Sequence, residues 1–231
     1  MDENLDLTLY QDATELIEVA TTEAMTAISL HLLNKGVCHL ALTGGTLGAD
    51  FAKTLVAKIN KSADLTGLNI WFSDERFSAA DSPLRNAAPV HDNLKNSTVI
   101  LHEVKASDGE LTVQAAADLY AAELELIEMD ICILGLGPDG HVASLFPNHW
   151  EQSAPGKVIA ITDSPKPPAQ RVSFSIPFIN TSAQVWIIAA GAEKAAAVTQ
   201  VLEADLTVPA GHVMGAELTR LIVDAAAFFT E

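Results

Sequence analysis

An ionisable pair inside a glycine-rich segment is the part of this sequence best placed to do chemistry. Asp139 and His141 follow the apolar run Ile131–Leu134, which favours a strand buried on both faces. Three glycines and a proline stand in the six residues 135–140, so the segment is a loop with unusual backbone angles. We expect residues 143–146 to open a short helix. A histidine at the carboxyl end of a buried strand can act as a general base on a bound ligand.

Two other interpretations of this segment stay open at this point. The spacing Gly135-x-Gly137-x-x-Gly140 matches a dinucleotide fingerprint, although it begins well past the middle of the chain and not in an opening βαβ unit. Alternatively, Asp139-Gly140 is only a turn and His141 only a surface residue.

A second candidate motif is Thr43-Gly44-Gly45-Thr46, between a predicted strand and a predicted helix. Glycines let backbone N–H groups approach a ligand closely, and a helix N-terminus favours an anion. The motif therefore predicts a phosphate site. The alternative is a simple strand-to-helix turn.

Basic residues are informative because the chain holds 13 Lys and Arg against 30 Asp and Glu, a net charge of −17. Arg76, in Asp74-Glu75-Arg76, can bind phosphate or a sugar oxygen, and we expect Asp74 and Glu75 to hold it in place. Arg171 lies beside a proline-rich loop, and Lys194 follows a predicted strand. Either can close over a phosphate. The alternatives are a solvated charge run at 74–76 and an ordinary exposed lysine at 194.

The pattern of apolar residues alternates strands with helices, which indicates one α/β domain over residues 1–231 with a mostly parallel sheet and helices on both faces. The predicted strands are 7–10, 37–42, 68–72, 99–101, 131–134, 158–161, 171–174, 185–189 and 218–223. The first predicted helix starts near Asp12 or Thr14 and ends near Asn34. The other predicted helices are 49–59, 86–94, 111–127, 192–202 and 225–229.

Composition excludes several classes of protein. With 49% apolar residues and net charge −17, the chain suits a globular domain and not a nucleic-acid-binding surface. We find no apolar run of membrane-spanning length and no signal peptide, so the cytoplasm is the expected location. Cys38 and Cys132 fall in predicted buried strands, which favours free thiols over a disulfide. The histidines lack metal-ligand spacing.

The motifs, taken in order, resemble the 6-phosphogluconolactonase family of the glucosamine/galactosamine-6-phosphate isomerase superfamily. They are Thr43-Gly-Gly-Thr, Trp71-x-x-Asp-Glu-Arg, Gly135-x-Gly-x-Asp-Gly-His-x-Ala-Ser-Leu-Phe-Pro, Lys166-Pro-Pro-x-x-Arg and Gly191-x-x-Lys. The resemblance implies a three-layer, doubly wound α/β/α fold shared with glucosamine-6-phosphate deaminase and ribose-5-phosphate isomerase relatives. It implies hydrolysis of 6-phosphoglucono-δ-lactone without a metal or other cofactor. The chain departs from the family pattern at Leu47-Gly48, where Thr-Pro is usual, and at Asn148, where Gly is usual.

The resemblance also suggests roles for the candidate residues. His141 takes a proton from water that attacks the lactone, Asp139 orients the loop or the imidazole, and loop N–H groups with Arg76 bind the oxyanion. The residues assigned to the oxyanion loop are Gly137 and Gly140, and those assigned to the substrate and its phosphate are Gly44, Gly45, Thr46, Asp74, Arg171 and Lys194. The expected partner is a small sugar-phosphate lactone, with no nucleic acid or membrane, and the protein is a monomer or a homodimer.

Two alternative functions share this fold. A sugar-phosphate deaminase or isomerase would have a carboxylate shortly after the histidine, where this chain has Ser144-Leu145-Phe146. A sugar-phosphate-sensing domain of a transcriptional regulator would carry a basic DNA-binding segment, and none is evident.

Overall fold

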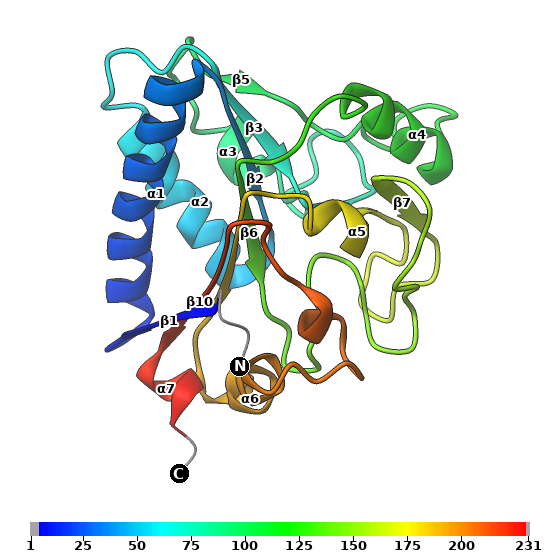
Figure 1. Ribbon diagram of the computed structural model, residues 1–231. Helices are drawn as coiled ribbons and strands as arrows, with labels where there is room; N and C mark the ends of the chain where they lie inside the picture. Colours follow the sequence, from blue (N-terminus) through cyan, green and yellow to red (C-terminus); the bar gives the residue numbers. More distant parts are fainter. Residues whose placement is uncertain (1–4, 230–231) are drawn as a thin grey trace.

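The computed structural model describes residues 5–229, which are organised around a seven-stranded sheet (Figure 1). The strand order is β1-β10-β9-β6-β2-β3-β5, and each neighbouring pair is parallel. The strands are β1 (Leu5–Tyr10), β2 (Cys38–Leu42), β3 (Leu68–Phe72), β5 (Ile100–Leu101), β6 (Ile131–Gly135), β9 (Gln184–Ala189) and β10 (Leu218–Asp224).

Helices cover both faces of the sheet and make three layers (Figure 1). One face packs against α1 (Ala13–Lys35), α2 (Gly45–Ile59) and α3 (Ala88–His91), and the other against α4 (Val113–Glu123), α5 (Ile176–Ile179), α6 (Ala195–Leu202) and α7 (Ala225–Phe228). Successive residues of a strand enter opposite cores: Leu40 and Leu42 face α1 and α2, and Ala41 faces the other layer. The predicted three-layer α/β fold is confirmed. Cys38 and Cys132 are buried and free, as expected.

Helix α1 begins and ends where its capping residues predict. The side chain of Asp12 accepts hydrogen bonds from the N–H groups of Thr14 and Glu15, and Gly36 ends the helix at φ 72°. Its 23 residues are long and apolar enough to cross a membrane by length and composition alone, which the search for continuous apolar runs did not detect. In the structure Leu16, Ala20, Ala24 and Ile28 are buried in the core that α1 shares with α2. Packing against the domain accounts for these apolar residues of α1, while Leu30 and Leu33 of the same helix are exposed.

A second, three-stranded antiparallel sheet corrects the predicted arrangement of strands. Its order is β4 (Asp74–Arg76), β8 (Arg171–Phe174) and β7 (Val158–Ile161). Only a loop joins β7 to β8, and a parallel pairing would need a longer crossover, so these strands form an antiparallel pair outside the main sheet. The residues of β4, expected in a loop, pair with β8, and Arg76 stands opposite Arg171 in the ladder.

Several predicted boundaries were also wrong. Helix α2 begins at Gly45, four residues before the predicted start, while α3 and α4 are shorter than predicted. Residues 143–146 form a tight turn with a bridge between Val142 and Leu145, not the opening of a helix. Ala143 has φ 50° in this turn, which a right-handed helix does not allow.

The strand order places a topological switch point between β2 and β6. From β2 the chain continues to β3 and β5 on one side of this point. From β6 it continues to β9 and β10 on the other side, where β1 forms the edge of the sheet. In doubly wound sheets the loops after such strands diverge and leave a crevice that binds ligands. The loops after β2 and β6 carry the two glycine-rich motifs of the sequence.

Candidate active site

A cavity of ≈ 610 Å³ opens at the carboxyl ends of β2, β6 and β9. Its walls come from the loops after these strands, from β4 and from the proline-rich loop before β8. Most of the site residues predicted from the sequence line it: Gly44, Gly45, Thr46, Asp74, Arg76, Gly137, His141, Arg171 and Lys194. Asp139 and Gly140 lie beside His141 in the same loop.

The imidazole of His141 is held by Asp139 and by Phe146. Nδ1 of His141 forms a short hydrogen bond with Oδ1 of Asp139, and the centres of the His141 and Phe146 rings are 4.4 Å apart. A carboxylate on Nδ1 fixes the neutral tautomer that carries its proton there, so Nε2 keeps its lone pair. No residue within 5–229 hydrogen-bonds Nε2. The ring is therefore arranged to accept a proton from a ligand.

Burial and charge act in opposite directions on His141. Burial lowers the pKa of His141 below its usual value, while Asp139 partly opposes this shift. Burial would by itself raise the pKa of Asp139, but its hydrogen bond with His141 and the neighbouring charges hold that pKa below its usual value. The pair is thus a neutral imidazole beside a carboxylate at neutral pH.

Gly137 makes room for this ring. A Cβ atom at Gly137 would lie 1.9 Å from Nδ1 of His141. The expectation that Gly137 and Gly140 offer free N–H groups to an oxyanion is wrong, because Gly137 N–H donates to the carbonyl of His141 at 2.8 Å and Gly140 N–H to the carbonyl of Gly137 at 3.0 Å. These glycines shape the loop.

The turn after His141 is apolar and buried. Leu145 and Phe146 are each only 1% exposed, and Leu145 belongs to the larger core. Ser144 is fully buried and donates its hydroxyl to Oδ2 of Asp74 at 2.7 Å. The turn after His141 therefore contributes no carboxylate to the site, and the carboxylate that contacts His141 comes from Asp139, before it in the chain.

The N-terminus of α2 presents free backbone donors to the cavity. Gly44 is its N-cap residue and has no side-chain acceptor for the first-turn N–H groups. The N–H groups of the first turn, including those of Gly45 and Thr46, have no intrahelical partner and line the cavity. Together with the partial positive charge of the helix end, they make an anion site.

Besides Arg76, the cavity is lined by the cationic side chains of Arg171 and Lys194. Arg171 is buried and donates to the carbonyls of Lys166, Pro167 and Pro168, and its Nη1 lies 3.4 Å from the hydroxyl of Ser144. Of the five guanidinium N–H groups, one on Nη1 is left for a ligand. Burial lowers the pKa of Arg171 from a value far above neutrality, and burial also lowers the pKa of Lys194.

Lys166 is a cavity residue that the sequence analysis did not assign to the site. Its Nζ is 3.9 Å from Oδ1 of Asp139 and 5.6 Å from the centre of the Phe146 ring. Lys166 could have been predicted as a site residue, because it belongs to the motif Lys166-Pro-Pro-x-x-Arg171, whose arginine was predicted to bind the phosphate.

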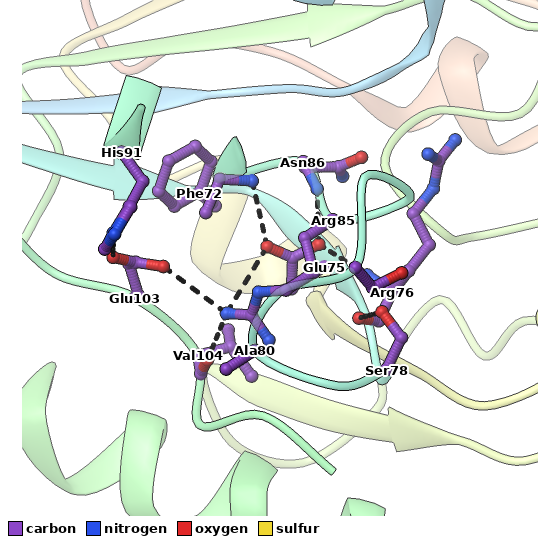
Figure 2. Close-up of polar contacts among 12 residues, drawn as sticks. Phe72, Glu75, Arg76, Ser78, Ala80, Arg85, Asn86, His91, Glu103 and Val104 are labelled. Carbon is purple, nitrogen blue, oxygen red and sulfur yellow. Dashed lines mark hydrogen bonds and ion pairs between the residues drawn. The ribbon is translucent and has the colours of Figure 1, made fainter. Parts of the chain in front are cut away.

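Asp74 and Glu75 do not hold the guanidinium of Arg76, which corrects a second expectation. Nη1 of Arg76 donates to the carbonyl of Leu84 at 2.7 Å, and its Nε is buried without a hydrogen-bond partner among the described residues. Glu75 instead accepts the backbone N–H of Arg76 at 2.7 Å. Figure 2 shows the Arg76 guanidinium extending away from Glu75.

Asp74 is the centre of a buried network. Its Oδ2 accepts from Ser144 and its Oδ1 from the amide nitrogen of Asn86 at 2.9 Å. Both carboxylate oxygens are therefore engaged within the protein, so Asp74 is placed to position its neighbours more than to bind a ligand itself. Asn86 and Ser144 were missed from the sequence, because their partner lies far away in the chain.

Within residues 5–229, no three His, Cys, Asp or Glu side chains are grouped so that they could hold a metal ion.

The family model for glucosamine-6-phosphate isomerases/6-phosphogluconolactonase matches residues 11–222. The chain belongs to this family. The resemblance inferred from the motifs is thus confirmed over nearly the whole sequence.

Members of this family in two bacteria illustrate the similarity. The 6-phosphogluconolactonase of Streptomyces coelicolor is 33% identical over 247 residues, covering 98% of this chain and 95% of that protein. The structure of 6-phosphogluconolactonase from Thermotoga maritima has a TM-score of 0.82 and 26% identity, covering 95% of this chain and 99% of that one. A monomeric glucosamine-6-phosphate deaminase has a TM-score of 0.77 at 19% identity, covering 96% and 98% of the two chains, which shows a common fold only.

Asn148 and Gly48, which depart from the 6-phosphogluconolactonase pattern in this family, have local explanations. Asn148 has φ 64°, and asparagine is one of the few residues besides glycine that adopt this conformation readily. At Gly48 a Cβ would lie 2.9 Å from both the γ-methyl and the carbonyl oxygen of Thr43. The threonine at position 43 thus leaves no space for a larger residue at position 48.

Proposed function

We propose that this protein hydrolyses 6-phosphoglucono-δ-lactone to 6-phosphogluconate in the oxidative pentose phosphate pathway. The observation that carries the proposal is the His141–Asp139 pair, in which Nε2 of His141 has no partner among the described residues. The pair lies in a cavity that also contains the N-terminus of α2, whose N-cap residue Gly44 provides no side-chain hydrogen bond. An enzyme that hydrolyses a phosphorylated lactone needs a general base for the water and an anion site for the phosphate. The named relatives support the same substrate.

The reaction adds one water molecule across the ester bond of the lactone. Nε2 of His141 takes a proton from water as its oxygen bonds to C1. The C1–O bond of the ring then breaks, and the imidazolium returns the proton to the departing ring oxygen, which becomes the C5 hydroxyl. Asp139 keeps the ring in the required tautomer and stabilises the transient imidazolium.

The oxyanion and the phosphate require separate donors. Since the N–H groups of Gly137 and Gly140 are used within the loop, Arg76, which lines the cavity, is the better oxyanion donor. The phosphate is bound by the first-turn N–H groups at Gly45 and Thr46 with Lys194 and the remaining N–H of Arg171. Binding at this remote end positions C1 and lowers the barrier.

A deaminase is the less favoured function, although a deaminase shares the fold. Residues 144–146 are buried and include no acid that could protonate an amine or a ring oxygen. We further propose that the chain acts as a single domain in the cytoplasm, as a monomer or a homodimer, without a cofactor.

The test is hydrolysis of freshly generated 6-phosphogluconolactone, corrected for spontaneous opening, by the wild-type protein and by His141→Ala. Removing a general base lowers the rate by about 10²–10⁴-fold, so we expect a loss in that range with an unchanged melting temperature. Glucosamine 6-phosphate is the comparison substrate and should release no ammonia. Ammonia release at a rate comparable with lactone hydrolysis would assign the protein to the deaminases.

A further inference from the structure

Lys166 brings a positive charge to the Asp139–His141 pair that the proposed reaction does not use. Its Nζ is 3.9 Å from Oδ1 of Asp139, the same oxygen that bonds Nδ1 of His141. Lys166 lines the cavity with a side chain that is 47% exposed, and its Nζ forms no hydrogen bond with any of residues 5–229. The ammonium group therefore acts on the pair through its charge.

The backbone of the proline-rich loop fixes the place of this charge. The carbonyl of Lys166 accepts from Nη2 of Arg171 at 3.0 Å and from the hydroxyl of Ser164 at 3.0 Å. The Lys166 side chain extends to the ring of Phe146, whose centre is 5.6 Å from Nζ and 4.4 Å from the centre of the His141 ring. Lys166 and the base thus lie at the same aromatic side chain.

A carboxylate on Nδ1 orients the imidazole but also favours its protonation. Burial lowers the pKa of His141 and Lys166 lowers it as well, while Asp139 and Asp74 raise it. The other charged groups of the cavity wall are Asp50, Arg76, Arg171, Glu193 and Lys194. The positive charge of Lys166 offsets part of the negative charge of Asp139 and leaves its hydrogen bond to His141 intact.

We propose that Lys166 is a positioning residue for the general base, whose ammonium group lets Asp139 hold the His141 ring without converting it to an imidazolium. This proposal rests on the proposed lactonase function. Asp139 supplies the hydrogen bond that selects the tautomer, and Lys166 offsets the charge that comes with it. The base then stays neutral into mildly acidic solution, where Asp139 without Lys166 would leave more of it protonated.

The experiment replaces Lys166 with an uncharged side chain of similar length, in Lys166→Met. The acid limb of kcat/KM for 6-phosphogluconolactone should move to higher pH by a few tenths of a pH unit, because His141 gains a proton more readily. On that limb kcat/KM should fall about two- to fivefold below wild type, while the plateaus should agree within about twofold. Lys166→Arg restores the charge and should return the limb toward its wild-type position.

The titration of His141 gives a readout that does not depend on catalysis. NMR of the His141 ring in substrate-free protein follows its protonation directly, and the ring should titrate at higher pH in Lys166→Met than in wild type. Lys53→Met is the matched control, because Lys53 is 56% exposed and pairs with Asp50 at 3.6 Å. This control loses the same charge and should shift neither the acid limb nor the titration.

Three results overturn the inference. An acid limb and a His141 titration that coincide in wild type and Lys166→Met mean that the ammonium group does not act on the pair. A uniform loss of kcat/KM at every pH, with the titration unmoved, means that Lys166 binds the substrate instead. Equal shifts in Lys166→Met and Lys166→Arg mean that packing and not charge is responsible.

Failure of the proposed function gives a different result from failure of this inference. If the wild type hydrolyses no lactone, the proposed function fails. The His141 titration still decides whether Lys166 acts on the pair, since a shift in Lys166→Met supports that action and an unmoved titration overturns it.

Discussion

His141 combines two opposing requirements of a general base. It must be neutral to accept a proton, which burial ensures, and it must tolerate the positive charge that follows, which Asp139 ensures. The side chains of this pair are two residues apart in the chain, and Gly137 leaves the space in which they meet. The loop sequence thus supplies both the reactive side chains and the glycine, Gly137, that leaves space for them.

The pH dependence of activity follows from this pair. Because the pKa of His141 lies below its usual value, activity should persist as the pH falls and decline only when His141 becomes protonated. Asp139 raises the pKa of His141, so Asp139→Asn should shift the acid limb of kcat/KM to a lower pH and also lower the plateau. A limb that stays in place, measured from pH 4 to 8 with correction for spontaneous opening, would show that Asp139 does not act on the base.

Lys194 gives the sharpest test of the phosphate end. It lines the cavity and, unlike Arg171, forms no hydrogen bond with the proline-rich loop among residues 5–229. Lys194→Ala should raise KM for 6-phosphogluconolactone by about tenfold, the effect of roughly 1.4 kcal/mol of lost charge-assisted binding. Unphosphorylated gluconolactone should be affected far less. Similar losses on both substrates would place Lys194 away from the phosphate.

At the scale of elements, β4 organises one wall of the site. Its Glu75 accepts the backbone N–H groups of Arg76 and Asn86 (Figure 2). It also accepts that of Ala87, and so closes the loop between these residues. Arg85 lies between Glu75 and Glu103, with Nη2 at 3.8 Å and 3.5 Å from their nearest oxygens. The loop that runs from the end of β4 at Arg76 to Asn86 is thus held by a buried carboxylate.

Glu75 should leave a signature in the pH dependence of stability. Burial raises the pKa of Glu75 to about 7, against the opposing effects of Arg85 and the three N–H groups. Between pH of about 4.5 and 7 the unfolded chain has released this proton and the folded chain retains it, so this group makes the folded state less stable as the pH rises. The stability advantage of wild type over Glu75→Gln should therefore shrink across this window.

Urea unfolding at a series of pH values measures this difference. Glu103→Gln is the control, because Glu103 contacts the same arginine but its side chain is 29% exposed. An advantage of wild type over Glu75→Gln that is constant from pH 4.5 to 7 would mean that Glu75 is ionised throughout.

For the whole molecule, the distribution of charge is the notable property. The net charge is −17, yet Arg76, Lys166, Arg171 and Lys194 all border one cavity. An acidic surface favours solubility, while these four cations, which outnumber the acidic lining residues Asp50, Asp74 and Glu193, attract an anionic substrate locally together with the helix N-terminus. The small sheet brings two of these cations together, since it pairs the strand of Arg76 with that of Arg171.

Metal removal tests the chemistry of the complete protein. Water attack on a lactone needs no Lewis acid when a histidine supplies the base, so activity should survive prolonged dialysis against a chelator. The assay is the rate of lactone hydrolysis before and after dialysis, with and without added divalent cations. Loss on dialysis and recovery with a cation would require a metal in the mechanism.

Most of the main sheet could be predicted from the sequence, because its strands are buried on both faces and appear as short apolar runs. The same rule could not assign β7 and β8, since apolar periodicity reports burial and not the partner of a strand. Residues 143–146 were predicted as a helix because their side chains are compatible with one. The positive φ of Ala143 results from how the turn packs against the core.

The sequence by itself determined the family, the three-layer fold and the pair Asp139 and His141, because each depends on residues close together in the chain or on a repeated pattern of burial. Only the tertiary structure decided which groups remain free to act. It showed that the N–H groups of Gly137 and Gly140 are already used, that Arg76 is not paired with its acidic neighbours, and that Lys166 lies beside Asp139. The physical reason is that one hydrogen bond uses up a backbone N–H group, and the partner of any polar group can come from any distance along the chain.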